Sequence, residues 1–183
     1  MIINTTPLAG VFVVQTAAKR DARGSFERLF CDKELEPVIQ HRSIRQINYS
    51  VNIQSGATRG LHYQNVPDAE MKLVRCLKGR VWDVALDLRF GSATFLQWFA
   101  HELTPGGSDM MVIPEGVAHG FQTLESDSHL LYLHTAYYSP SSESAVAWND
   151  PRLAITWPSE PSEISDRDRQ HPFLPVDYKG VVL

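Results

Sequence analysis

The chain has 183 residues, of which 43% are hydrophobic and 21% charged, a composition typical of one soluble globular domain. Its net charge of −4 argues against general nucleic-acid binding, although a few arginines that converge in a pocket could still hold phosphate. No apolar run approaches the roughly 18 residues of a membrane span, and residues 1–10 lack the features of a signal peptide. Cys31 and Cys76 match no metal-binding spacing and argue against a disulfide framework, so we expect a cytoplasmic protein.

Short apolar stretches bounded by Gly, Pro, Asn or Asp predict a succession of strands. In chain order the predicted strands are Gly10–Thr16, Ile44–Asn52, Thr58–Gln64, Lys72–Leu77, Arg80–Leu88, Thr94–Leu103, Met110–Ile113, Gly120–Leu124 and Leu130–Tyr138. One short helix is predicted over Asp32–Ile39, and an irregular flap over the barrel after Trp157. This pattern predicts an all-β fold, either a sandwich or a jelly roll.

Two local patterns refine this expectation. Apolar residues alternate with mostly polar ones from Trp82 to Arg89, which predicts a strand with one buried face. Lys78 and Gly79 lie between two strand-like runs and predict a hairpin turn that joins them.

Two histidines stand in patterns that could carry chemistry. His62 lies in RGLHYQ at 59–64, where it would share a strand face with Gln64, and with Arg59 only if a bulge occurs at Gly60. His119 follows the Pro-Glu-Gly turn of PEGVAHGF at 114–121. Either histidine alone is most simply a hydrogen-bonded structural residue. A general base or a metal ligand remains the alternative for His62.

Taken together, the two patterns resemble the metal-binding motifs of cupins, which have two histidines separated by one residue and a later Pro-x-Gly-x-x-His. The second motif is intact here, but Gln64 replaces the second histidine of the first motif. An amide oxygen is a poor substitute for imidazole at a transition-metal site. The sequence therefore favours proton chemistry in a cupin-like pocket, and we expect neither a metal nor another cofactor.

The combined motifs resemble the dTDP-4-dehydrorhamnose 3,5-epimerase family in order over nearly the whole chain. They are Asp21-x-Arg23-Gly24-x-Phe26, RGLHYQ at 59–64, KLVRC at 72–76, DVALDLR at 83–89, PEGVAHGF at 114–121, Tyr132, YYSP at 137–140, NDP at 149–151, Ile155-x-Trp157-Pro158 and SDRD at 165–168. The resemblance implies a single cupin-type jelly-roll domain over residues 1–183. It also implies a homodimer and a nucleotide-sugar substrate on the route to rhamnose or a related surface sugar.

The resemblance also implies catalytic roles. His62 would be the base that removes a carbon-bound proton next to a ketone, and Asp168 would orient its imidazole and stabilise the imidazolium. Tyr132 would be the acid that returns a proton from the other face, although a core aromatic residue is the plain alternative. Lys72 would stabilise the enolate oxygen unless its side chain extends to solvent.

Further residues of the resemblance would bind the substrate. Arg23 and Arg59 would grip the diphosphate, because a guanidinium fork matches phosphate oxygens. Polar contacts to phosphate, sugar or base would come from Gln46, Asn48 and His119, and Tyr138 would stack on the nucleobase. Glu143 and Arg167 occupy positions where the family has further substrate contacts. Each of these side chains could instead be a solvated surface group.

Departures from the family pattern keep other functions open. Lys19 stands where an aromatic residue is common, and Arg28 where a carboxylate is expected. These changes favour, as an alternative, an epimerase that acts at only C3 or only C5 of another nucleotide sugar, such as a CDP-linked one. A metal-dependent cupin and a non-catalytic sugar-nucleotide binding module are two further alternatives.

Overall fold

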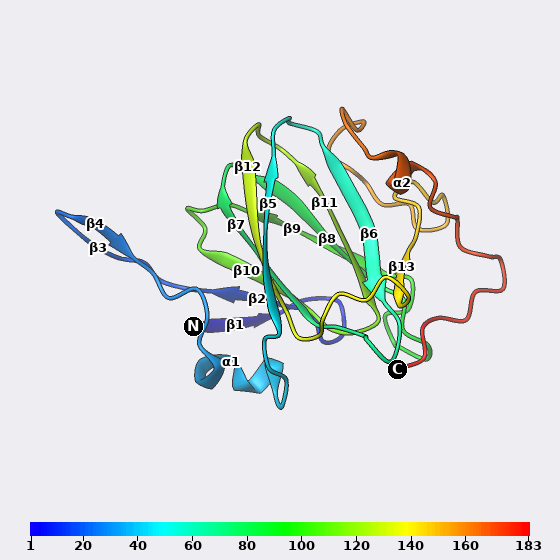
Figure 1. The fold of residues 1–183 in the computed structure, drawn as a ribbon, viewed down its shortest axis with the longest axis horizontal. Coiled ribbons are helices and arrows are strands. Elements are labelled where there is room, and N and C mark those ends of the chain that lie inside the picture. The colour runs from blue at the N-terminus through cyan, green and yellow to red at the C-terminus, as the bar shows by residue number, and fades with distance from the viewer.

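The computed structural model describes residues 1–183 and consists mainly of two antiparallel sheets packed face to face (Figure 1). The order of the six-stranded sheet is β1-β2-β10-β7-β12-β5, and that of the five-stranded sheet is β13-β6-β11-β8-β9. A third, two-stranded sheet, β3-β4, forms a separate hairpin. The strands are β1 (Ile2–Thr5), β2 (Phe12–Gln15), β3 (Lys19–Asp21), β4 (Gly24–Phe26), β5 (Gln46–Asn52), β6 (Thr58–Gln64), β7 (Lys72–Lys78), β8 (Val81–Asp87), β9 (Trp98–Leu103), β10 (Asp109–Ile113), β11 (Val117–Thr123), β12 (Ser128–His134) and β13 (Glu143–Ala145).

Apolar side chains on the facing sides of the two sheets form the inner core. Val74 and Leu130 of the six-stranded sheet pack in one cluster with Ala85 and Phe121 of the five-stranded sheet, and Phe121 is only 2% exposed. Burial of this apolar area is the main favourable contribution to folding. Two sheets that share one core in this way form a cupin-type jelly roll, so the all-β expectation is confirmed.

The outer face of each sheet is covered by a different part of the chain. Helix α1 (Asp32–Ile39) buries Leu35 and Val38 against the outer face of the six-stranded sheet. The C-terminal tail, which includes the one-turn helix α2 (Asp166–Arg169), packs Leu153 and Leu174 against the outer face of the five-stranded sheet. Neither helix has the length and apolarity that a bilayer crossing requires.

Strand β8 corrects the expectation of a strand with one buried face. Both faces are buried, because the tail covers the side that carries Val84 and Leu86. The acidic residues on the inner side are fully buried and therefore paired: Asp83 bonds to a histidine, and Asp87 accepts from Arg89 at 2.7 Å. Burial alone would raise the pKa of Asp87, but hydrogen bonds from Arg89, Ser92 and Thr94 lower it to about 2.

Each predicted strand overlaps an observed one, although β9 begins four residues later and β12 ends four residues earlier than predicted. The predicted hairpin is wrong. Gly79 does form a turn, with φ of +74°, but β7 belongs to the six-stranded sheet and β8 to the five-stranded one. The turn therefore carries the chain from one sheet to the other, because the side of β7 is already occupied by β10 and β12. Strands β1, β3, β4 and β13 and helix α2 were not predicted. The helix Asp32–Ile39 is confirmed.

Candidate active site

A cleft of about 360 Å³ opens where β6 meets the tail, and several predicted site residues line it, namely Arg59, His62, Arg167 and Asp168. Arg59 and His62 share the cleft because β6 shifts its register against β11 between His119 and Phe121. The bulge that would bring them to one side is thus present. Gly60 permits it, since its φ is +120° and a Cβ there would lie 2.5 Å from the Cα of Gly120.

His62 and Asp168 form a hydrogen-bonded pair at the cleft. Nε2 of His62 lies 2.9 Å from Oδ1 of Asp168, and the Gly60 N–H donates to Oδ2 at 3.2 Å. Ser165 caps α2 by accepting from the Asp168 N–H at 3.1 Å, which fixes the helix that carries the carboxylate. Burial alone would raise the pKa of Asp168, but the bond and the charge of His62 hold it below its usual value, so the carboxyl is ionised.

His119 lies between the proposed base and the proposed acid. On β11 it is the register partner of His62, and its ring meets the ring of Tyr132 edge-on at 5.9 Å between centroids. Its Nε2 lies 2.7 Å from Oδ1 of Asp83, which holds the imidazole in place. Burial, followed by the charge of Asp83, raises the pKa of Tyr132 above its usual value, so the phenol keeps the proton that an acid must donate.

Lys72 points into the barrel and does not extend to solvent. It is buried on β7, and its Nζ donates to the His62 carbonyl at 3.1 Å and lies 3.3 Å from Oε1 of Glu70. This position places an ammonium group directly beside the strand that carries the proposed base. A fixed positive charge there suits an oxygen that becomes negative during a reaction.

Predicted substrate-binding side chains gather at the mouth of the barrel. The Tyr138 hydroxyl donates to Glu143 at 2.9 Å, and Arg167 forms an ion pair with the same carboxylate. The Tyr138 N–H donates to Oε1 of Gln46 at 2.9 Å, and Gln46 in turn contacts Asn48 at 3.4 Å. Residues from β5, β13 and α2 therefore form one polar rim beside His62.

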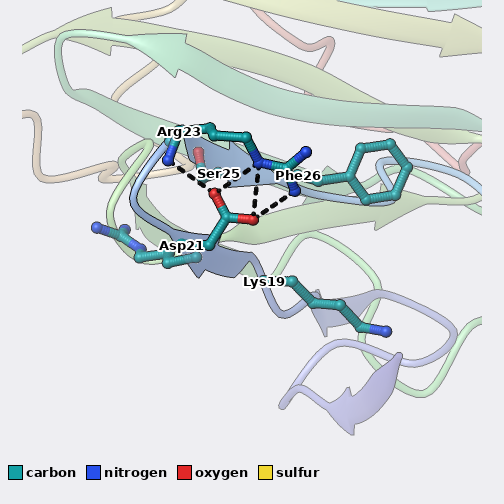
Figure 2. Close-up of a pocket in the computed structure, with 7 residues that line it drawn as sticks. Lys19, Asp21, Arg23, Ser25 and Phe26 are labelled. Carbon is teal, nitrogen blue, oxygen red and sulfur yellow. Dashed lines mark hydrogen bonds and ion pairs between the residues drawn. The ribbon is translucent and has the colours of Figure 1, made fainter.

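Arg23 does not join this group within the chain. It lies on the β3-β4 hairpin, which projects away from the two sheets at the left of Figure 1. Its side chain is 90% exposed and donates to Asp21 at 2.6 Å. Figure 2 shows this pair on the hairpin. Phe26 on the same hairpin is 75% exposed. Arg23 and Arg59 therefore line different clefts of the chain.

The residues at the cupin metal positions are engaged in other contacts. The Gln64 amide donates to the carbonyls of Asp68 and Tyr137 and accepts from the Ser139 N–H, so it anchors a loop. One compact group of ligand-type side chains exists: His62, Asp168 and His171, whose nitrogen and oxygen atoms lie within 4.8 Å of one another. Both imidazoles of that group bond to Oδ1 of Asp168, so the group is a hydrogen-bonded triad.

Known proteins match both the sequence and the fold. A sequence profile of dTDP-4-dehydrorhamnose 3,5-epimerase matches residues 5–175. The dTDP-4-dehydrorhamnose 3,5-epimerase of Salmonella typhimurium is 39% identical over 95% of this chain and 96% of its own length. The chain belongs to the dTDP-4-dehydrorhamnose 3,5-epimerase family.

Solved structures of 3,5-epimerases of dTDP-sugars share the same fold. The Bacillus anthracis enzyme, with TDP and pyrophosphate bound, superposes with a TM-score of 0.90 at 36% identity and covers 94% of this chain and 99% of its own. The Legionella pneumophila epimerase, in complex with dTDP-4-keto-L-rhamnose, gives 0.89 at 36% identity and covers 94% and 92%.

Several residues of this epimerase site were missed by the sequence analysis. Asp83, Glu70 and His134 looked like ordinary strand or loop residues, yet all three are buried next to the proposed catalytic groups. His171 lies 3.2 Å from Oδ1 of Asp168 and edge-on to His62, with 5.4 Å between the ring centroids. Its spacing three residues after Asp168, which places both on one side of a helical turn, was the available signal.

Proposed function

We propose that the chain epimerises a dTDP-linked 4-keto-6-deoxyhexose at C3 and C5, with His62 as base and Tyr132 as acid. The observation that carries the proposal is the placement of these two groups. His62 comes from the five-stranded sheet and Tyr132 from the six-stranded sheet, and both border His119. A base and an acid on opposite walls can reach opposite faces of one sugar ring, which is what inversion at carbon requires.

The hydrogen bonds assign the proton that each group handles. Because the Asp168 carboxylate accepts from Nε2 of His62, the Nδ1 lone pair is left to take the proton on the carbon next to the ketone. The C–H electron pair then forms an enolate, whose oxygen is stabilised by the Lys72 ammonium. The Tyr132 phenol returns a proton to the same carbon from the other face, and the ketone re-forms. Solvent restores both groups before the second carbon reacts.

The polar rim supplies the nucleotide contacts in this proposal. Arg59 faces the cleft beside His62 and binds a phosphate, with His119 as a further polar contact. The cluster of Tyr138, Glu143 and Arg167 offers an aromatic ring, held by its hydroxyl, for a nucleobase. Gln46 and Asn48 present amide groups at the same rim.

The homodimer completes the site in this proposal. The outer side of β5 exposes apolar residues, among them Ile47 at 61% and Tyr49 at 57%, and a projecting hairpin also exposes Phe26. A second copy that covers this apolar face can bring its own hairpin, and with it Arg23, to the cleft. Arg23 would then bind the diphosphate in trans. Because both cysteines are free, we place the dimer in the cytoplasm.

Solvent-deuterium incorporation tests the function and the residue roles together. With dTDP-4-keto-6-deoxyglucose, the wild-type protein is expected to incorporate deuterium at both C3 and C5, as followed by NMR. His62→Ala should abolish incorporation at both carbons because the base is gone. Tyr132→Phe should retain exchange but lose inversion, because the proton then returns from the face of the base.

A histidine outside the cleft provides the control variant, and three other results of the exchange experiment would contradict the proposal. His101 lies on β9, outside the cleft, and pairs with Asp109 of β10. Its replacement in His101→Ala should leave deuterium exchange unchanged. Incorporation at one carbon only would identify a mono-epimerase. Tight binding of dTDP without any exchange would identify a binding module, and full exchange in His62→Ala would refute the assigned base.

A further inference from the structure

Three buried ionisable side chains form a cluster beside the proposed pocket, and the mechanism above uses only one of them. Glu70 accepts from Nδ1 of His134 at 2.8 Å through Oε2, and its Oε1 lies 3.3 Å from Nζ of Lys72. All three side chains are at most 11% exposed. Burial alone would raise the pKa of Glu70, but the bond from His134 and the charge of Lys72 lower it, so the carboxyl is ionised.

The cluster continues, contact by contact, to the polar rim. The second ring nitrogen of His134, Nε2, lies 3.3 Å from Nδ2 of Asn48. Oδ1 of Asn48 accepts from Nε2 of Gln46 at 3.4 Å, and Oε1 of Gln46 accepts from the Tyr138 N–H at 2.9 Å. An unbroken series of polar contacts thus joins the catalytic lysine to the residues proposed to hold the nucleotide sugar.

Donor and acceptor roles along this series are determined from its buried end. An ionised Glu70 can only accept, so Nδ1 of His134 carries the hydrogen, and Nε2 faces Nδ2 of Asn48 as the acceptor of that contact. The Asn48 amide must then turn its NH₂ towards His134, which directs its oxygen at Gln46. A flipped Asn48 would set its oxygen against the Nε2 lone pair of His134. A flipped Gln46 would set its NH₂ against the Tyr138 N–H and its oxygen against that of Asn48.

We propose that His134, held by Glu70, is a positioning residue that fixes the amide orientation of Asn48 and Gln46 and thereby helps to select the substrate. This inference rests on the proposed function, in which both amides contact the nucleotide sugar. A fixed amide presents a donor at one place and an acceptor at another, and a bound ligand with the opposite pattern leaves these amide groups unpaired. The proton-transfer groups themselves are not touched by His134 through hydrogen bonds.

A substitution that keeps the ring and removes its nitrogens isolates this role. The ring of His134 stacks on Tyr132 with centroids 6.0 Å apart and planes 21° apart, and His134→Phe can preserve that contact. We expect KM to rise about tenfold, the scale of one hydrogen bond to a polar ligand, while kcat stays within about threefold. If the phenylalanine variant does not fold, His134→Leu replaces it. His101→Phe is the matched control and should leave KM unchanged.

Rescue by an amide separates positioning from packing. A glutamine carries a donor and an acceptor on one planar group, so His134→Gln can donate to Glu70 and accept from Asn48 at once. We expect its KM to lie within about twofold of the wild-type value, since the polar series is restored. A KM equally raised in the glutamine and phenylalanine variants would overturn the proposal.

A double-mutant cycle tests whether His134 acts through Asn48. If His134 acts through Asn48, then His134→Phe should add nothing to the KM of Asn48→Ala, whereas independent effects would multiply and refute the inference. Turnover by the wild-type protein reports separately on the proposed function. Should the wild type prove inactive, the dissociation constant of dTDP, measured by calorimetry on the same variants, replaces KM in every comparison.

Discussion

Replacement of Asp168 by asparagine removes the carboxylate charge without changing the size of the side chain. The carboxylate accepts from His62 and His171 at Oδ1 and from the Gly60 N–H at Oδ2, whereas an amide has only one acceptor oxygen. If that oxygen keeps the His62 bond, the amide NH₂ opposes the Gly60 N–H. If the amide turns round, its NH₂ opposes Nε2 of His62.

The size of the effect follows from the charge and its burial. In the proposed mechanism Asp168 stabilises the imidazolium that forms when His62 takes the substrate proton, and a hydrogen bond to a charged group contributes about 1.5–3 kcal/mol. The carboxylate is 6% exposed, so solvent screens it poorly. At about 1.4 kcal/mol for each factor of ten, we expect kcat to fall about 10- to 100-fold. KM should change little, because the carboxylate lies behind the imidazole.

Initial rates of the coupled epimerisation, with kcat and KM fitted separately, measure this effect. Asp166→Asn is the matched control: Asp166 lies two residues away on the same helix and is exposed, so its replacement should leave both constants unchanged. Thermal unfolding of each variant shows whether the fold is retained. A folded Asp168→Asn protein whose kcat lies within about threefold of wild type would refute the pairing argument.

Three further outcomes are expected. The folded-state pKa of Asp87 is about 2 against a usual 3.8, so its charge stabilises the fold above pH 4 and this contribution disappears as the pH falls towards 2. Asp87→Asn should therefore lower the free energy of unfolding in urea by about 2 kcal/mol at pH 7 and by progressively less in acid. A loss that does not depend on pH would contradict this. Gly60→Ala should lower both the unfolding midpoint and kcat, because the new Cβ meets the Gly120 backbone at 2.5 Å; an unchanged midpoint would show that the bulge relaxes freely. Mixed dimers of Arg23→Ala and His62→Ala subunits should recover activity that neither variant has alone, and failure to recover it would argue against an arginine supplied in trans.

The strands could be predicted from the sequence because each is a short apolar run between turn residues. Their assignment to sheets could not, because pairing depends on contacts between residues far apart in the chain. Lys78 and Gly79 illustrate the difference: the turn is there, but its two strands belong to opposite sheets. The short strand β13 and the hairpin β3-β4 contain few apolar residues and so gave no strand signal.

Some residues of the candidate site could likewise be predicted from the sequence, and others could not. Motif resemblance led to His62 and Asp168, which are 106 residues apart and meet only in the folded chain. Asp83 and Glu70 were not predicted, because an acidic residue in a strand or loop looks like a surface group until the two sheets pack and the partner histidines enclose it. Arg23 resembles a site residue in sequence, yet it stands on a hairpin that projects away from the two sheets.

The jelly roll has a mechanical consequence for catalysis. The proposed base, His62, and the proposed acid, Tyr132, lie on two different sheets, so the distance between them depends on the side chains that separate the sheets. Phe121 stacks on His119 with centroids 6.3 Å apart and belongs to that filling together with Leu130. A substitution of one aliphatic or aromatic core residue can therefore change the distance between the two proton-transfer side chains, while those side chains themselves stay the same.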